Sequence, residues 1–235
     1  MKSIIKKILY SDRLTVDQIF RQQGRIHTFL NPCSYLVARR NKKVYLNYDR
    51  VYADGMILAH FVNILFSKKI QRRSMDMTSL ADPLFKFCDA NNKTIYFLGS
   101  KDIEIKKFVS LVKIKYNLKV VGYRDGYIKS INERDEVIQN IIHLNPDFLL
   151  VGMGSPIQEK FLNDLKNRGW EGIGFTCGGF FHQSIKKSSY YPHWIDKTNT
   201  RFLYRIYKEK HTRSRYLEAF IKFPYCIMTD VIIHK

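Results

Sequence analysis

The stretch that follows Asp147 has the residue types and spacing of a phosphate-binding turn. A hydrophobic run, Asp147–Val151, predicts a buried strand. Gly152 and Gly154 come next and let the backbone turn sharply and approach a ligand. Pro156 then suits the first turn of a helix. A strand that ends in a glycine turn at a helix N-terminus presents N–H groups to an anion. The alternative is a strand–helix junction that binds nothing.

Two polar residues, Gln158 and Glu159, fall in the first turn of that predicted helix. In an open α/β sheet, ligands bind in the crevice at the carboxyl ends of the strands. The amide and the carboxylate therefore favour a binding site over a simple junction, and we expect both side chains to border a ligand.

The segment Tyr52-Ala53-Asp54-Gly55 is a second chemical candidate, since it lies between a predicted strand and a predicted helix. Asp54 can present its carboxylate to the same crevice and accept a proton as a general base. Aspartate is also common in turns that have no catalytic role. Upstream, Asn31 closes the preceding strand and can place an amide in the crevice.

Two further predicted strands end at glycines. One ends at Gly99, and the other leads into the segment Val121–Tyr127, which contains Gly122 and Asp125. Together with the turn at Gly152, three strand ends carry glycine turns, which suits a phosphorylated nucleotide better than any single turn does. None of them matches a Walker motif or a G-x-G-x-x-G fingerprint.

The sequence contains no metal-binding pattern that we recognise. There is no Asp-x-Asp triplet, and the related Asp102-Ile103-Glu104 lies at a predicted helix start, where carboxylates are favourable anyway. The cysteines are scattered without a C-x-x-C pair, which argues against a zinc site and against a disulfide framework. We therefore predict that no metal and no cofactor are required.

The elements that must position these residues alternate along the chain. Apolar runs predict strands over 26–30, 44–47, 94–98, 119–122, 147–151 and 172–176. Amphipathic stretches predict helices over 32–40, 55–66, 78–90, 101–116, 132–143 and 156–167, with Asn132 as the N-cap of the fifth. This alternation predicts an α/β fold with a mostly parallel sheet and helices on both faces.

Charge is the unusual property of the composition. Among 235 residues, 40 Lys and Arg oppose 21 Asp and Glu, which gives a net charge of +19. Such a surface favours nucleic acid, an anionic membrane or phosphorylated substrates. No apolar run approaches the roughly 20 residues of a membrane span, and the N-terminus lacks the apolar core of a signal peptide. We therefore expect a cytoplasmic protein.

The chain becomes basic and aromatic from residue 186 onward. This mixture suits a membrane interface, where aromatic rings and Lys or Arg meet anionic lipid. It also suits single-stranded nucleic acid, or a helix packed on the domain with a solvated basic face. The arginines that can hold an acceptor phosphate in this region are Arg201, Arg205, Arg213 and Arg215.

The chain carries, in order, the motifs Asn31, Ala53-Asp54-Gly55, Asp76, Gly122-Tyr123-Arg124-Asp125-Gly126-Tyr127, Gly152-Met153-Gly154-Ser155-Pro156-Ile157-Gln158-Glu159, Gly178-Gly179-Phe180 and Pro192-His193-Trp194. In this order, over residues 25–216, they resemble the motifs of the WecG/TagA/CpsF glycosyltransferases, glycosyltransferase family 26.

The resemblance implies a Rossmann-like α/β domain, which we assign to residues 1–185, and a basic helical C-terminal appendage over residues 186–235 that touches the membrane. It implies inverting transfer of a sugar from a UDP-sugar to a polyprenyl-diphosphate-linked acceptor at the cytoplasmic membrane face. The product would feed O-antigen, capsule, exopolysaccharide or teichoic acid. The family's proposed base corresponds to Asp54, and its Gln-Glu pair corresponds to Gln158 and Glu159.

We therefore predict Asp54 as the catalytic residue. The expected partners are a UDP-linked hexose or N-acetylhexosamine, the lipid-linked acceptor and an anionic membrane surface, without nucleic acid, at the inner face of the cytoplasmic membrane. The predicted substrate-binding set is Asn31, Gly99, Gly122, Asp125, Gly152, Gly154, Gln158, Glu159, Arg201, Arg205, Arg213 and Arg215.

Some positions depart from the family pattern. His182 stands where the family usually has an acid, Tyr190-Tyr191-Pro192 replaces Arg-Ala-Pro, and Arg201 stands at a common Glu position. Such changes can alter sugar selection, so the resemblance does not identify the sugar. Two rival interpretations are a basic nucleic-acid-binding protein, whose recognition motifs are absent, and a non-catalytic nucleotide-sugar-binding protein, against which the retained Asp54 argues.

Overall fold

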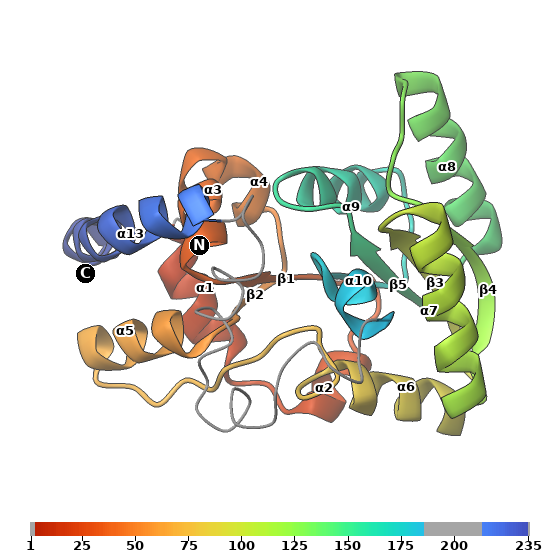
Figure 1. Ribbon diagram of the computed structural model, residues 1–235. Helices are drawn as coiled ribbons and strands as arrows, with labels where there is room; N and C mark the ends of the chain where they lie inside the picture. The colour runs from red at the N-terminus through yellow and green to blue at the C-terminus, as the bar shows by residue number, and fades with distance from the viewer. Residues whose placement is uncertain (1–2, 186–212, 235) are drawn as a thin grey trace.

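The computed structural model describes residues 3–185 and 213–234 (Figure 1). Its centre is a six-stranded sheet with the order β2-β1-β6-β5-β3-β4, in which all neighbouring strands are parallel. The strands are β1 (Ile26–Leu30), β2 (Arg50–Ala53), β3 (Thr94–Gly99), β4 (Lys119–Arg124), β5 (Phe148–Gly152) and β6 (Ile173–Thr176).

Each face of the sheet has its own hydrophobic core. Successive side chains of a strand point to opposite faces. In β5, Phe148 and Leu150 therefore belong to one core, whereas Leu149 and Val151 belong to the other. A parallel strand that is buried on both faces has a continuous apolar sequence, which is why this strand could be predicted. The predicted α/β fold is confirmed.

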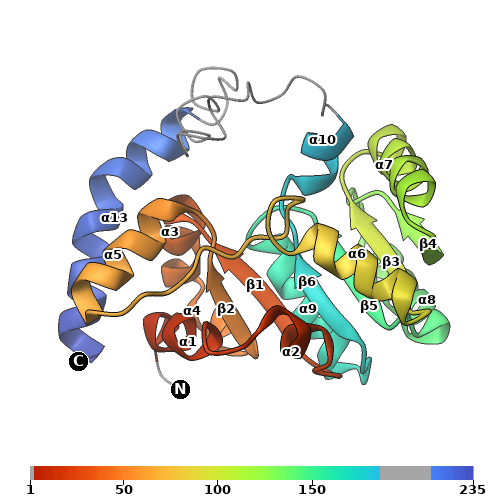
Figure 2. The same cartoon turned by 90° about the horizontal axis from the view of Figure 1, so that it is seen from below.

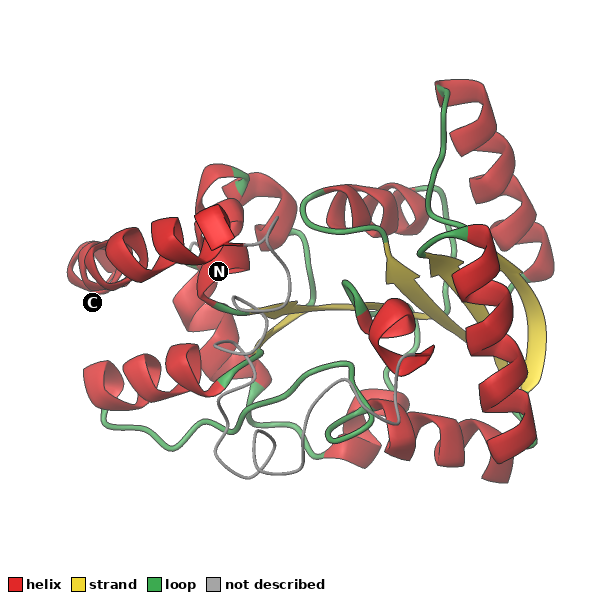
Figure 3. Ribbon diagram, viewed as in Figure 1, coloured by secondary structure: helices red, strands yellow, loops and turns green. Residues whose placement is uncertain are grey.

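The helices lie around the sheet, as Figures 2 and 3 show, and their buried residues divide between the two cores. Those that contribute to the first core are α1 (Ile4–Ser11), α3 (Pro32–Arg40), α4 (Lys42–Leu46), α5 (Met56–Phe66), α8 (Ile131–Leu144), α9 (Ile157–Asn167) and α13 (Arg213–His234). Those that contribute to the second are α2 (Val16–Phe20), α6 (Ala81–Ala90), α7 (Asp102–Lys115) and α10 (Phe180–Ile185).

Three local predictions differ from the structure. Residues 44–47 were expected to form a strand but belong mostly to α4, and the second strand is β2 instead. A short apolar run does not distinguish a strand from a buried helical turn. The N-cap of α8 is Ser130, not Asn132, because the Ser130 hydroxyl accepts a hydrogen bond from the Glu133 N–H. Helices α1 and α2 lay outside the predicted elements.

All strands are parallel, so their carboxyl ends lie at one edge of the sheet. The strand order places the residues after β1 and β2 on one side of this edge and the turns after β5, β3 and β4 on the other, with β6 between them. In open α/β sheets, the ligand crevice forms where the strand order reverses. The topology therefore brings Asp54 and the glycine turns to the same edge.

The C-terminal helix α13 packs on α3 and α5. Its inner face is buried and includes Ala219, Phe223 and Ile227. The Phe223 ring lies 5.5 Å from the ring of Tyr35 in α3 and 5.3 Å from the ring of Phe61 in α5. The expected basic helical appendage is thus present as α13, whereas its division from residues 1–185 as a separate domain stays a prediction.

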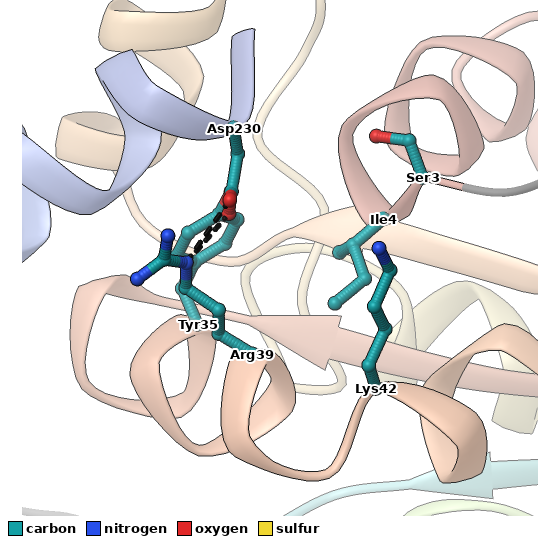
Figure 4. A pocket seen from close by; sticks show the side chains of 6 residues that line it. All are labelled: Ser3, Ile4, Tyr35, Arg39, Lys42 and Asp230. Atoms are coloured by element: carbon teal, nitrogen blue, oxygen red, sulfur yellow. Dashed lines mark hydrogen bonds and ion pairs between the residues drawn. The ribbon is translucent and has the colours of Figure 1, made fainter. Parts of the chain in front are cut away.

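Polar contacts also hold α13 on α3. The Asp230 carboxylate accepts hydrogen bonds from the Tyr35 hydroxyl at 2.7 Å and from Arg39 Nε at 3.0 Å (Figure 4). Nearer the start of α13, Arg40 pairs with Glu218. A small pocket between α1, α3 and α13 is lined by Ser3, Ile4, Tyr35, Arg39, Lys42 and Asp230. These contacts fix α13 to the helix that begins next to Asn31.

Candidate active site

The turns after β3, β4 and β5 contact one another through their backbones. The Ser100 N–H, which follows β3, donates to the Gly152 carbonyl at the end of β5 at 3.1 Å. The Gly126 N–H, in the loop after β4, donates to the Ser100 carbonyl at 2.9 Å. The structure therefore brings the predicted turns at Gly99 and Gly152 together, and the loop after β4 joins them through Gly126.

Glycine is required where the turns touch. Gly99 has a φ of +144°, and a Cβ on it would lie 2.3 Å from the Gly152 carbonyl oxygen. A Cβ on Gly152 would lie 2.7 Å from the carbonyl oxygen of Gly178, in the turn after β6. We call the contiguous backbone at Gly99, Ser100, Gly126, Gly152 and Gly178 the turn floor.

Gly122 was predicted to belong to a turn, and this prediction is wrong. It lies inside β4, opposite Tyr96 of β3. A Cβ on Gly122 would lie 2.5 Å from a carbon of the Tyr96 ring, so the glycine makes room for that ring. Asp125 follows β4, and its carboxylate accepts the Tyr127 N–H at 2.8 Å as an Asx turn.

Gly154 lies beyond the turn floor. It has a φ of +79°, and nothing lies within 4 Å of the place where a Cβ would be. Its carbonyl accepts the Gln158 N–H at 3.0 Å, which begins the hydrogen bonding of α9, and Pro156 is the N-cap of that helix. The turn after β5 therefore has open space above it.

Gln158 and Glu159 are 3% and 0% exposed, so their side chains lie beneath the turns and not in an open crevice. Glu159 Oε1 accepts hydrogen bonds from Thr28 Oγ1 at 3.2 Å, Ser155 Oγ at 2.9 Å and Gln158 Nε2 at 3.0 Å. Gln158 Oε1 accepts the Gly178 N–H at 3.1 Å. The pair therefore ties α9 to β1 and to the turn after β6.

Burial raises the pKa of the Glu159 carboxyl, and the donors around it oppose that shift only in part. Its second oxygen has no hydrogen-bond partner among the described residues. The network continues to β6, because Thr176 Oγ1 donates to Thr28 Oγ1 at 3.0 Å. Thr28 and Thr176 were not predicted as part of the site, although each is a polar residue inside an apolar strand.

Asp54 follows β2 at the carboxyl edge of the sheet. Its N–H donates to the Leu30 carbonyl at 2.6 Å, and its side chain is 34% exposed. Asp54 Oδ1 lies 3.5 Å from Nη2 of Arg72, which also donates to Ser74 Oγ at 2.6 Å and pairs with Asp76. A partly exposed carboxylate next to a guanidinium is thus held at this end of β2.

Arg72 lies between the carboxylates of Asp54 and Asp76 and keeps its positive charge. Burial opposes the charge of Asp76, but Arg72 and the hydroxyls of Ser74 and Thr78 outweigh it and hold the pKa of Asp76 at about 2. Burial also opposes the charge of Arg72, yet Asp54 and Asp76 raise its pKa above the ordinary value. Arg72 was not among the predicted site residues.

Asn31 lies beside the Asp54 turn. A Cβ on Gly55 would be 3.9 Å from Asn31 Cβ. Asn31 caps α3, because its Oδ1 accepts the Ser34 N–H at 3.0 Å and its own N–H donates to Ser34 Oγ at 2.8 Å. The amide oxygen predicted to face a ligand is therefore also the N-cap of the helix.

A second group of polar side chains lies against the turn floor. His182 Nδ1 is 2.6 Å from Glu104 Oε1, and Glu104 Oε2 accepts a hydrogen bond from Ser100 Oγ. From the sequence, His182 was noted only as a departure from the family pattern, and Glu104 was noted only as part of a predicted helix start. Their contact joins residues 78 positions apart, which no local pattern reveals.

The remaining predicted positions lie in the C-terminal region. Arg201 and Arg205 are outside the described residues. Arg213 begins α13 and is exposed, and Arg215 lies in the same helix. Among residues 3–185 and 213–234, no three His, Cys, Asp or Glu side chains are arranged to hold a metal ion.

Comparison with known proteins shows that a family model described as "Glycosyl transferase WecG/TagA/CpsF family" matches residues 10–235. A Shigella boydii protein named UDP-Gal:alpha-D-GlcNAc-diphosphoundecaprenol beta-1,4-galactosyltransferase is 34% identical over 197 residues, or 83% of this chain and 82% of that protein. The N-acetylglucosaminyldiphosphoundecaprenol N-acetyl-beta-D-mannosaminyltransferase of Bacillus subtilis (strain 168) is 24% identical over 202 residues, or 84% of this chain and 77% of that protein.

The raised pKa of Glu159 predicts how stability depends on pH. A carboxyl that binds its proton more tightly in the folded chain favours folding most below its unfolded pKa of about 4.3, and this contribution is lost as the pH rises. Glu159→Gln keeps the size and an acceptor oxygen but cannot ionise. We expect its melting temperature to change less than that of wild type between pH 5 and pH 8.

The measurement is thermal unfolding of both proteins across that pH range. Glu136→Gln, which replaces an exposed carboxyl on α8, is the matched control and should follow the wild-type curve. Parallel curves for Glu159→Gln and wild type would contradict the assignment of a perturbed carboxyl to this position.

Proposed function

We propose that this chain, which belongs to the WecG/TagA/CpsF family of glycosyltransferases, transfers a hexose or N-acetylhexosamine from a UDP-sugar to an acceptor sugar on a polyprenyl diphosphate. The observation that carries the proposal is a partly exposed carboxylate, Asp54, at the same sheet edge as the turn floor. The names of the Shigella and Bacillus relatives both specify a GlcNAc-diphosphoundecaprenol acceptor, which supports a lipid-linked acceptor in surface polysaccharide synthesis.

The turn floor suits the diphosphate of the donor. Helices α7 and α9 both begin there, and the N–H groups of a helix's first turn have no partner within the helix. These groups and the helix dipoles attract anionic oxygens. The open space above Gly154 leaves room for a ligand at this place.

Asp54 suits the base of the reaction. In the proposed step, the acceptor hydroxyl gives its proton to Asp54 and its oxygen bonds to the anomeric carbon, while the bond from that carbon to the diphosphate breaks. Asp54 follows β2, and the floor lies at β6, β5, β3 and β4, so base and leaving group flank the sugar. This arrangement favours inversion, and the beta linkages in the relatives' names fit inversion of an α-linked donor.

Arg72 is proposed to position the base. Its guanidinium contacts Asp54 and is itself held by Ser74 and Asp76. The backbone supports this arrangement, because the Arg73 N–H donates to the Ala53 carbonyl at 2.9 Å and so holds the neighbouring Arg72 at the end of β2.

Helix α13 is proposed to contact the membrane. None of the helices in the described part of the chain has both the length and the apolar character needed to cross a bilayer. The outer face of α13 nevertheless carries an apolar stripe, made of Leu217, Phe220, Ile221, Tyr225, Met228 and Ile232, whose exposed fractions range from 51% to 80%. These residues recur at helical spacing. With the basic charge of the chain, the stripe suits a helix lying in the interface of an anionic membrane.

The first test replaces the base. Asp54→Asn keeps the size and turn preference but cannot accept the proton, so turnover should fall by roughly 10²–10⁴. Transfer from UDP-hexoses and UDP-N-acetylhexosamines to a GlcNAc-diphospho-lipid is followed by mass spectrometry, and UDP binding by calorimetry. UDP binding should be largely kept.

Asp89→Asn, an exposed position on α6, is the matched control and should turn over like wild type. Normal turnover in Asp54→Asn would remove Asp54 from the mechanism. A wild-type protein that binds UDP-sugars but transfers none to the acceptor would instead be a nucleotide-sugar-binding protein.

The second test concerns metal. We infer that backbone N–H groups and basic side chains stabilise the leaving diphosphate, since the sequence has no Asp-x-Asp triplet. Transfer should keep its wild-type rate in excess EDTA. Loss of transfer with EDTA, and its recovery on adding Mg²⁺ or Mn²⁺, would overturn the inference.

The third test concerns α13. Burying a Phe or Ile side chain is worth about 1.5–3 kcal/mol, so changing both Phe220 and Ile221 to Asp should lower partitioning into anionic phosphatidylglycerol vesicles by at least about tenfold. Flotation at low and high salt measures this, because salt weakens the electrostatic part. Ile114→Asp with Ile131→Asp, both exposed elsewhere, is the control. Equal flotation of the two double variants would contradict a membrane role for the stripe.

A further inference from the structure

His182 is linked to the turn floor by two hydrogen bonds in series. Its Nδ1 lies 2.6 Å from one oxygen of Glu104, and the other oxygen accepts the Ser100 hydroxyl. Ser100 contacts Gly152 and Gly126 through its own N–H and carbonyl. A histidine ring is therefore tied to the residue at which three turns meet.

Two helices that begin at the turn floor hold this group. Helix α7 follows Ser100 with Lys101 as its N-cap and carries Glu104 in its first turn. Helix α10 starts directly after Gly178 and Gly179 and carries His182. The two helices lie side by side in Figures 1 and 2. Phe181 and Phe108 pack between them, with ring centroids 4.8 Å apart. The contact is thus part of a packed interface and not a chance surface pair.

Glu104 sets the orientation of the ring. Burial opposes its charge, but Ser100, His182 and the Lys101 N–H outweigh it and lower the pKa of Glu104. An ionised carboxylate fixes Nδ1 as the nitrogen that donates to it, which leaves Nε2 for another partner. The His182 side chain is 38% exposed, twice the 19% of Glu104, so a ligand can reach it.

The charges also explain why a histidine suits this position. An acid, which the family pattern places here, would stand next to the Glu104 carboxylate and would repel both it and a bound diphosphate. A histidine attracts both groups. Glu104 does not need the ring as a helix cap, because it already accepts the Lys101 N–H and the Ser100 hydroxyl.

We propose that His182 is a second catalytic residue, which donates from Nε2–H to the β-phosphate of the departing nucleoside diphosphate, with Glu104 as its positioning residue. This inference rests on the proposed function. As the acceptor oxygen bonds to the anomeric carbon and its proton passes to Asp54, the electron pair of the breaking bond goes to the β-phosphate oxygen. His182 stabilises the charge that develops there as an imidazolium, because Nδ1–H already donates to Glu104 and Nε2 carries a hydrogen only in the charged ring.

The test compares two nucleotides that differ only in the β-phosphate. His182→Gln should weaken UDP binding by about tenfold or more, since a hydrogen bond between charged groups is lost. It should leave UMP binding within about twofold of wild type and should lower kcat. Calorimetry with UDP and UMP gives the affinities, and transfer to a GlcNAc-diphospho-lipid gives kcat.

Three variants complete the experiment. His182→Arg keeps a cation and should retain part of the preference for UDP over UMP, whereas Glu104→Gln should reduce that preference without abolishing UMP binding. His143→Gln, an exposed histidine on α8 at the opposite edge of the sheet, is the matched control and should behave like wild type. Thermal unfolding of each variant verifies that it is folded.

The outcomes separate this inference from the proposed function. A wild-type protein that neither binds UDP nor transfers sugar would defeat the proposed function. If wild type does both and His182→Gln matches it, only the role of His182 fails. Equal losses of UDP and UMP affinity would show that His182 merely supports the fold, and would also overturn the inference.

Discussion

The site depends on close contact between the backbones at the carboxyl ends of β3, β5 and β6. Gly99, Gly152 and Gly178 lie so close that a Cβ added to Gly99 or Gly152 would be only 2.3–2.7 Å from a carbonyl oxygen of the next glycine. Because the turns touch, the helices that follow them, α7, α9 and α10, all begin within a few residues of these contacts. Three helix starts that lie far apart in the sequence therefore come together, because the glycines at these contacts have no Cβ. A phosphate that binds there would meet the first-turn N–H groups of α7 and α9, whose positions the sheet determines.

A buried polar network holds this arrangement from beneath. Leaving a buried carboxyl without partners costs several kcal/mol, so its hydrogen bonds matter more than their number suggests. Glu159 receives three donors on one oxygen, from β1, from the turn after β5 and from Gln158. Gln158 in turn receives the Gly178 N–H. The Gln-Glu pair therefore fixes α9, β1 and the turn after β6 relative to one another, which pre-organises the turn floor.

The sequence predicted those parts of the structure that short-range patterns encode. Apolar runs ending at Gly99 and Gly152 located two strands and their turns, and alternation with helices predicted the parallel sheet. Gly122 was misassigned because β4 continues for two residues beyond it. The sequence alone does not distinguish a glycine inside a strand from a glycine that ends one. Val44–Leu46 was misassigned because a short apolar run fits a helix or a strand equally well. Arg72 and His182 were missed as members of the site because their roles come from contacts with Asp54 and Glu104 across 18 and 78 positions.

The position of α13 links the proposed membrane surface to the proposed base. Helix α13 packs on α3 and α5 through Phe223. These two helices begin directly after the residues of the carboxyl edge, α3 after Asn31 and α5 after Gly55. Helix α5 has 11 residues, so its axis is about 16 Å long. A single layer of short helices, α3 and α5, thus connects α13 with the edge of the sheet at which Asp54 lies. In the proposed reaction, a lipid-linked acceptor held at the stripe would have its diphosphate and first sugar at the membrane boundary, close to the side of the sheet edge where Asp54 lies. The turn floor, where we propose that the donor diphosphate binds, occupies the other side of that edge. The two substrates would then approach from opposite sides of β1 and β6, as an in-line displacement with inversion requires.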